Sequence, residues 1–192
     1  MCALLQDMAI PLLAKKWGNE YADMIQKSNT RQVRLSTLEH DLMGWDHAEA
    51  GGMLTVNWGL GEFVADIVSQ HTNSFFADYD ISEPSLVGIT ALSALLPKVQ
   101  DRQWFESIAF VDGYRKMFGS KLTELPEILK IADEDGERLM SMVNLGTPPK
   151  RLKEHWDNTL NGLTLTDPEN TEAVEEQLEE YFAQCVSTGE SK

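Results

Sequence analysis

Apolar side chains recur at intervals of three and four residues along almost the whole of this 192-residue chain. The spacing is clear over residues 2–16, 19–28 and 101–118, where it places the apolar side chains on one face of a helix. No segment shows a convincing alternation of apolar and polar residues, which a half-buried strand would require. The pattern therefore predicts an all-α fold. The length suits one domain, or a domain with a helical extension.

A proline and a capping motif predict the boundaries of the first helices. Pro11 lies well inside the predicted helix over residues 2–16, so we expect a kink or a break at that position. Ser36 and Glu39 have the spacing of a capping box, which predicts a helix with Ser36 as its N-cap. Gly44 predicts the end of that short helix.

Two adjacent glycines lie within the next predicted helix. Asp46 is its expected N-cap, and the helix runs to about residue 58 with Gly51 and Gly52 in its interior. Each glycine costs about 1 kcal/mol relative to alanine in a helix, so a close approach to another helix or to a ligand would explain both. A turn at residues 59–61 leads into a helix that we expect to end near His71.

Further helix starts are predicted downstream of a connection over residues 72–82. Ser82 is the expected cap of a helix that reaches about residue 96, and Thr123 of a helix over residues 124–144. Asp167 and Pro168 begin a last, acidic helix that continues to about residue 186. The apolar side chains of this last helix give it one docking side: Val174, Leu178, Tyr181 and Phe182.

Charge and cysteine content exclude several classes of protein. The formal net charge is −15, from 16 Lys and Arg against 31 Asp and Glu, so we expect no direct binding to nucleic acid or to an anionic membrane. No apolar run approaches the roughly 20 residues that span a bilayer. Cys2 and Cys185 are the only cysteines, which excludes a disulfide scaffold and favours a cytoplasmic protein.

Asp7, His47 and His71 are the residues whose chemistry needs an explanation. Imidazole and carboxylate groups bind divalent cations, and three such ligands on helices could form a metal site. Spacings of 40 and 24 residues are compatible with that site but do not specify it. Structural roles explain each residue as well: hydrogen bonding for His47, the helix dipole for His71, and a paired or protonated carboxyl for Asp7. On residue types alone, we favour structural roles for these three residues over metal binding.

The order of motifs over residues 4–72 resembles the later half of an HDOD domain, a non-catalytic relative of the HD-superfamily phosphohydrolases. A family run of the form LLHDIG corresponds to Leu-Leu-Gln-Asp-Met-Ala at residues 4–9. The G-x-D/T-H-x-E-x-G block corresponds to residues 44–51, and the W-G-L-P motif to residues 58–61. A final His-His pair corresponds to residues 71–72. The resemblance implies an HD-superfamily-like helical bundle, and the match to a later half leads us to expect that the N-terminal half is missing.

Departures from the family pattern fall on the positions that would hold a metal. The first-motif histidine is Gln6, the second histidine of the late pair is Thr72, and a further aspartate of catalytic relatives aligns with Leu92. An amide is a poor substitute for imidazole as a ligand for transition metals, and loss of several ligands should abolish the site. We therefore expect no catalytic residue, no metal and no cofactor.

Under this interpretation Gln6, Asp7, His47 and His71 are vestigial positions of a lost metal site. We hypothesise that His47 or His71 now pairs with Asp7 and replaces the cation as its counter-charge. A structure in which neither imidazole reaches Asp7 would refute that hypothesis.

The resemblance implies a non-catalytic signal-transduction or regulatory module of the bacterial cytoplasm that works through protein–protein contacts. We expect an HDOD-like half over residues 1–75, a helical region over 76–150 that packs on it, and an extension over 151–192. The expected partner is a protein, and a homo-oligomer is compatible with the sequence. Candidate contact regions are the acidic C-terminal helix and the apolar face that a missing first half would cover.

Two other readings stay open. In the first, the chain is a divalent-metal-dependent phosphohydrolase or phosphodiesterase acting on a nucleotide or cyclic dinucleotide. It would use Asp7, His47 and His71, helped by Asp46 or Glu49. In the second, the chain is a degenerate fragment without a function of its own.

Overall fold

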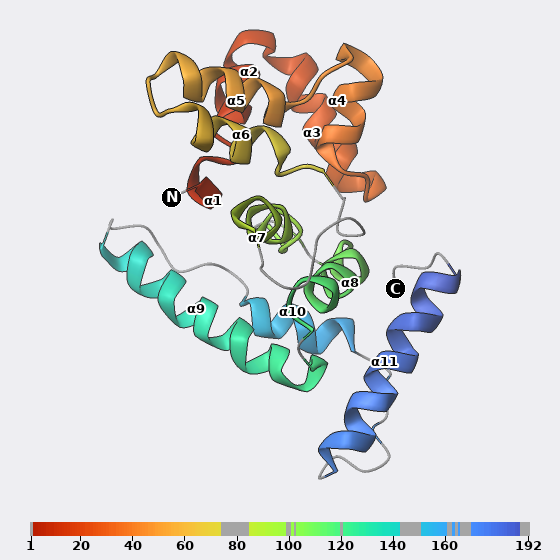
Figure 1. The fold of residues 1–192 in the computed structure, drawn as a ribbon. Coiled ribbons are helices and arrows are strands. Elements are labelled where there is room, and N and C mark those ends of the chain that lie inside the picture. Colours follow the sequence, from red (N-terminus) through yellow and green to blue (C-terminus); the bar gives the residue numbers. More distant parts are fainter. Residues whose placement is uncertain are drawn as a thin grey trace. The chain divides into compact units, whose positions relative to one another are not determined.

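The computed structural model describes residues 2–73, 85–98, 101, 103–119, 121–142, 151–160, 163, 165 and 170–188. Every regular element within these residues is a helix, so the all-α prediction is confirmed (Figure 1). The chain forms two compact units, residues 1–94 and residues 95–192, called here the first unit and the second unit. The expected division into residues 1–75, 76–150 and 151–192 stays a prediction. None of the described helices has the length and apolar composition that a membrane crossing needs.

The first unit begins with two short helices, α1 (Cys2–Leu5) and α2 (Ala9–Trp17). A turn at residues 6–8 separates them, with the Met8 amide donating to the Leu5 carbonyl at 3.1 Å. The expected break is therefore present, but its place at Pro11 is wrong. Pro11 lies in the first turn of α2, where its missing N–H would have had no partner within the helix in any case.

Helices α3 (Asn19–Arg31) and α4 (Leu35–Met43) follow, and their apolar faces close a small core. Trp17 stacks on Tyr21 at 6.4 Å between ring centroids and also contacts Trp45 at 5.7 Å. The buried members of this core come from α2, α3 and α4: Ala9, Leu13, Tyr21, Met24 and Leu35.

The predicted capping box at the start of α4 is wrong. Arg34 occupies the N-cap position without a side-chain cap, and α4 begins at Leu35 rather than after Ser36. The Glu39 side chain is fully buried and bonds to other helices instead of to its own N-terminus. The expected end at Gly44 is confirmed, because Gly44 has a left-handed backbone with φ of 77°.

Helices α5 (His47–Asn57) and α6 (Glu62–Gln70) form a closely packed hairpin (Figure 1). Asp46 caps α5 as predicted: its carboxylate accepts from the amides of Ala48 and Glu49, both at 3.0 Å. A methyl group on Gly52 would lie 2.8 Å from the Cβ atom of Ser69 in α6. The glycine pair thus permits a close approach between two helices, as the sequence predicted. Helix α7 (Leu86–Ser93) completes the first unit, and Ser85 caps it by accepting from the amide of Gly88 at 3.1 Å.

The second unit contains α8 (Ser107–Phe118), a 3-10 turn (Leu122–Glu124), α9 (Leu125–Met142), α10 (Leu152–Thr159) and α11 (Thr171–Thr188). The predicted docking side of α11 includes Leu178 and Phe182, which are buried, and the Phe182 ring stacks on Trp156 at 5.6 Å. The predicted cap at Ser82 and the predicted helix start at residues 167–168 lie outside the described residues.

Two carboxylates of the second unit satisfy the starts of other helices. The Glu175 carboxylate accepts from the amides of Leu122 and Thr123 at 2.6 and 2.8 Å. Thr123 therefore lies inside the 3-10 turn and does not cap α9, which corrects the sequence prediction. Asp133 does the same for α10, because its carboxylate accepts from the amides of Leu152 and Lys153 at 2.8 and 3.1 Å.

Candidate functional site

Asp7, His47 and His71 meet at one place in the first unit. Asp7 lies in the turn between α1 and α2, His47 is the first residue of α5, and His71 directly follows α6. The Nε2 atom of His47 lies 3.3 Å from Oδ1 of Asp7, and the Nε2 atom of His71 lies 3.5 Å from the same oxygen. The two imidazole rings are 5.2 Å apart. The structure thus brings together the three residues that the sequence singled out.

The glycines of α5 explain how residues so far apart in the sequence converge. In the antiparallel hairpin, the start of α5 lies beside the end of α6, which places His47 near His71. A methyl group on Gly51 would lie 3.0 Å from Val68 in α6 and 3.7 Å from the backbone carbonyl of Gln6. Gly51 therefore lets both α6 and the turn that carries Asp7 approach α5 closely.

Glu39 orients the imidazole of His47. The Nδ1–H group of His47 donates to Oε2 of Glu39 at 2.5 Å, and the backbone amide of His47 donates to the same oxygen at 3.0 Å. The Tyr21 hydroxyl donates to the other carboxylate oxygen of Glu39. These contacts fix the ring so that its Nε2 atom faces Asp7.

The sequence prediction missed this role, because it placed Glu39 in a capping box. A signal was present in the spacing: Glu39 lies one helical turn after Leu35, on the face that Leu35 buries. A carboxylate on a buried face requires partners from elsewhere in the fold. Tyr21 and His47 supply them.

His71 presents a different environment on the other side of Asp7. Its Nδ1–H group donates to the backbone carbonyl of Val68 at 2.7 Å. In the neutral tautomer that this bond fixes, Nε2 carries a lone pair and no proton. That atom is buried and makes no hydrogen bond within the part of the chain that the structure describes. Its nearest charged neighbour is Asp7, so the site holds an unsatisfied acceptor next to a carboxylate.

The charges of Asp7 and His47 stabilise each other. Burial works against the charged form of both residues, but their mutual hydrogen bond outweighs it. The pKa of His47 rises from 6.5 to about 9, because Asp7 and then Glu39 hold its proton. The pKa of Asp7 falls below its ordinary range through the hydrogen bond and the charge of His47. At neutral pH an imidazolium therefore lies between two carboxylates.

The hypothesis that an imidazole replaced the cation requires His47 or His71 to lie close to Asp7. Both imidazoles lie within ion-pair distance of the Asp7 carboxylate. The Asp7 side chain is only partly buried: it is 51% exposed, so the site opens to solvent on that side.

Three residues depart from the metal-binding pattern of the family, and the structure shows the surroundings of each one. Ser93 donates its hydroxyl to the Gln6 amide oxygen at 3.3 Å, which links the α1–α2 turn to α7. The Thr72 hydroxyl donates to Asp46 at 2.7 Å, at the N-cap of α5. The Leu92 side chain is buried. Gln6 and Thr72 thus have structural contacts, and Leu92 is part of the interior.

The remaining donors would fit one divalent cation. The ligand atoms of Asp7, His47 and His71 lie within 4.8 Å of one another. Glu39 and the Val68 carbonyl hold the two Nδ1–H groups, an arrangement typical of the outer partners of metal-binding histidines. The unsatisfied Nε2 atom of His71 also fits a cation. Opposing this, a cation would have to displace the tightly held proton of His47.

Comparison with known proteins gives a family for the part of the chain that carries this site. Residues 1–74 match the HDOD domain. Neither a curated protein nor a solved structure matches the chain significantly. HDOD domains are generally non-catalytic relatives of HD-type domains and are often regulatory or signalling modules. Residues 1–74, which carry the whole of the candidate site, are thus similar to an HDOD domain.

Proposed function

We propose that the chain is a non-catalytic regulatory module of the bacterial cytoplasm that acts through protein–protein contacts. One observation carries the proposal: His47 lies between Asp7 and Glu39 with its pKa raised to about 9. Because the imidazolium offsets one of the two carboxylate charges and bonds to both groups, the site has an internal counter-charge in the place of a cation. The structural contacts of Gln6 and Thr72 support the same conclusion.

The acidic helix α11 is one candidate contact region. Glu172, Glu176 and Glu180 are exposed and four residues apart, so they form a stripe on one face of the helix. The buried pair Leu178 and Phe182 anchors the opposite face within the second unit. This arrangement leaves a charged, regularly spaced surface that suits a basic partner.

Metal analysis combined with a turnover assay tests the proposal. The purified chain is equilibrated with Mn²⁺, passed over a desalting column and analysed for bound metal. It is then assayed with a cyclic dinucleotide and with a chromogenic phosphodiester. We expect no stoichiometric metal and no turnover above that of an Asp7→Asn variant. Stoichiometric metal together with turnover that disappears in Asp7→Asn would overturn the proposal.

A second candidate function is a metal-dependent phosphohydrolase acting on a nucleotide or cyclic dinucleotide. The observation that favours it is the unsatisfied Nε2 atom of His71 beside Asp7 and His47. These three residues would hold the cation and Glu39 would orient His47. A bound cation supplies Lewis-acid polarisation of a phosphoryl oxygen and an activated water.

The suggested helpers of that reaction have other bonds. Asp46 accepts from backbone amides and from Thr72, and Glu49 accepts from the Asp46 amide at 3.1 Å. These bonds form the capping box of α5, so both carboxylates already have structural roles.

A further inference from the structure

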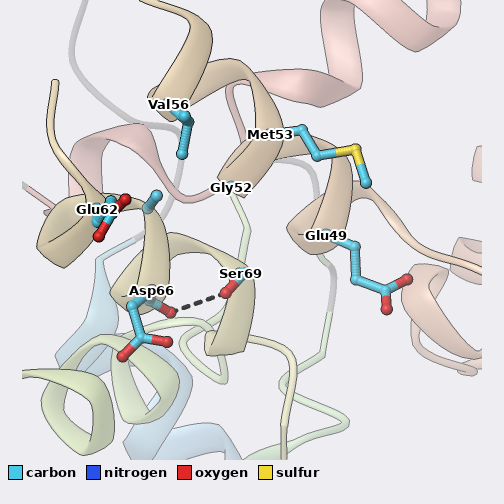
Figure 2. A pocket seen from close by; sticks show the side chains of 8 residues that line it. Glu49, Gly52, Met53, Val56, Glu62, Asp66 and Ser69 are labelled. Carbon is cyan, nitrogen blue, oxygen red and sulfur yellow. Dashed lines mark hydrogen bonds between the residues drawn. The ribbon is translucent and has the colours of Figure 1, made fainter. Parts of the chain in front are cut away.

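A groove of about 660 Å³ runs along the surface between α5 and α6, separate from the histidine site. Figure 2 shows Gly52, Met53 and Val56 on α5, and Asp66 and Ser69 on α6. Because Gly52 has no side chain, α6 approaches α5 closely and the bottom of the groove is backbone and small side chains. The close packing that positions the histidines thus also shapes this surface.

Exposed apolar side chains line the α5 side of the groove. Met53 is 71% exposed and Val56 is 53% exposed. The connection into α6 and its first turn expose three more large apolar side chains: Trp58, Leu60 and Phe63. Exposed apolar groups concentrated on one helical hairpin are typical of a binding surface, and methionine adapts its shape to a partner.

Carboxylates flank the apolar side chains without any basic residue among them. Glu49, Glu62 and Asp66 line the groove. Among the described residues, none of the three forms an ion pair with a Lys or Arg side chain. The sequence gives the reason, because residues 35–97 contain no Lys and no Arg. The groove therefore has an apolar α5 side and carboxylates whose charge no Lys or Arg of residues 35–97 compensates.

We propose that the α5–α6 groove docks a short, basic amphipathic helix of a partner protein. The proposal rests on the proposed function and names a surface and a partner chemistry for it. Two packed helices offer a groove that accepts the ridge of a third helix. Helix α5 has 11 residues and is about 16 Å long, which matches roughly three turns of a partner.

Charge selects this occupant over the other candidates. A second copy of the chain would bring a net charge of −15 to an acidic surface, which opposes self-association through the groove. Anionic lipid and nucleic acid are repelled for the same reason. A helix with Leu side chains on one face and Lys or Arg beside them would match both the apolar side chains and the carboxylates of the groove.

A pair of synthetic peptides tests the proposal on the full chain. The first is an amphipathic helix of about 14 residues with Leu on one face and Lys elsewhere, and the second has Glu in place of every Lys. We expect the Lys peptide to bind and to shift the backbone amide NMR signals of Gly52, Met53, Ala65 and Ser69. We expect no binding of the Glu peptide. Equal binding of both peptides, or binding without shifts in α5 and α6, would overturn the proposal.

Matched charge variants separate the groove from the general acidity of the chain. Glu62→Gln with Asp66→Asn removes two carboxylates of the groove. Asp23→Asn with Asp41→Asn removes two exposed carboxylates of α3 and α4 that do not line it. We expect the first pair to weaken Lys-peptide binding about fivefold and the second to change it less than twofold. Equal weakening by both pairs would contradict a docking site in the groove.

An apolar variant and a measurement of mass complete the test. Met53→Ser removes an exposed side chain, so the fold should be retained while Lys-peptide binding weakens about tenfold. Self-association of the chain that disappears in Met53→Ser would identify the occupant as a second copy and overturn the proposal. None of these measurements depends on Asp7. Absence of peptide binding in an inert chain would remove the groove assignment alone, whereas Asp7-dependent turnover would remove the proposed function.

Discussion

The two units differ in the groups that donate hydrogen bonds to their buried or half-buried carboxylates. In the first unit, Glu39 accepts from the Tyr21 hydroxyl and from both the ring and the amide of His47. In the second unit, Glu175 and Asp133 accept only from backbone amides at helix starts. The imidazolium of His47 loses its proton near pH 9, whereas a backbone amide does not titrate in that range. The two units should therefore differ in their sensitivity to substitution and to pH.

The largest effect is expected from Glu39→Ala. The change leaves the Tyr21 hydroxyl without its acceptor and leaves the imidazolium of His47 without one of its two carboxylates. Breaking a buried ionic network by removing one partner costs about 3–5 kcal/mol. Urea unfolding followed by pulsed hydrogen exchange, read peptide by peptide, should show this loss in the first unit. An unchanged midpoint in α4 and α5 would show that Glu39 contributes little.

Raising the pH should destabilise the first unit by a slightly smaller amount. The pKa of His47 is raised from 6.5 to about 9 on folding, so its contribution is fully present below pH 6.5 and is lost as the pH rises through about 9. The shift corresponds to up to about 3 kcal/mol. The lowered pKa of Asp7 acts in the opposite direction: its contribution is present above its ordinary value of 3.8 and is lost as the pH falls through its depressed pKa.

Urea unfolding at several pH values measures this difference between the two units. Each sample is transferred to one common pH for the pulse of hydrogen exchange, so that the exchange chemistry stays the same. The first unit should lose stability between about pH 7 and pH 10, while peptides of α9 and α10 should change much less. A His47→Asn variant should flatten the dependence. The same slope in that variant would assign the pH effect to another group.

A glycine-to-alanine substitution should have opposite signs in the two units. In Gly52→Ala the new methyl group would lie 2.8 Å from Ser69 Cβ and 3.1 Å from the carbonyl of Ala65, so the hairpin must move apart at a cost of about 1–3 kcal/mol. In Gly136→Ala, within α9, the methyl group meets nothing within 4 Å, and the gain in helix propensity is about 1 kcal/mol. Thermal unfolding of each variant measures the two effects. Stabilisation by Gly52→Ala would contradict the close α5–α6 approach.

Features with a local cause were predictable from the sequence, and features with a tertiary cause were not. The Asp46 cap and the Gly44 end depend on neighbouring residues, and both predictions are confirmed. Ser36 and Glu39 fit the same kind of local pattern, but a cap is worth only about 1 kcal/mol. The buried bonds of Glu39 to Tyr21 and His47 outweigh it.

The candidate site shows the same division. Residue types and spacing alone left Asp7, His47 and His71 open to several roles, and the order of the family motifs grouped them. Their common orientation depends on the Val68 carbonyl and on Glu39, which lie at unrelated positions in the sequence. Similarly, Glu175 lies more than 50 residues from the amides that it satisfies. No periodic pattern encodes contacts of that kind.

The smallest effect that distinguishes the units is expected from Glu175→Ala. The change leaves the amides of Leu122 and Thr123 without an acceptor at a start where Leu122 is fully buried, which costs about 1–2 kcal/mol. The loss should appear in exchange of the 3-10 turn and of α9, and it should not vary with pH as the first unit does. Glu176→Ala, at an exposed neighbour on the same helix, should stay within about 0.5 kcal/mol of the parent. If Glu176→Ala lowered the stability as much as Glu175→Ala, both losses would come from the charge of α11. The bonds of Glu175 to backbone amides would then not explain the stability of the second unit.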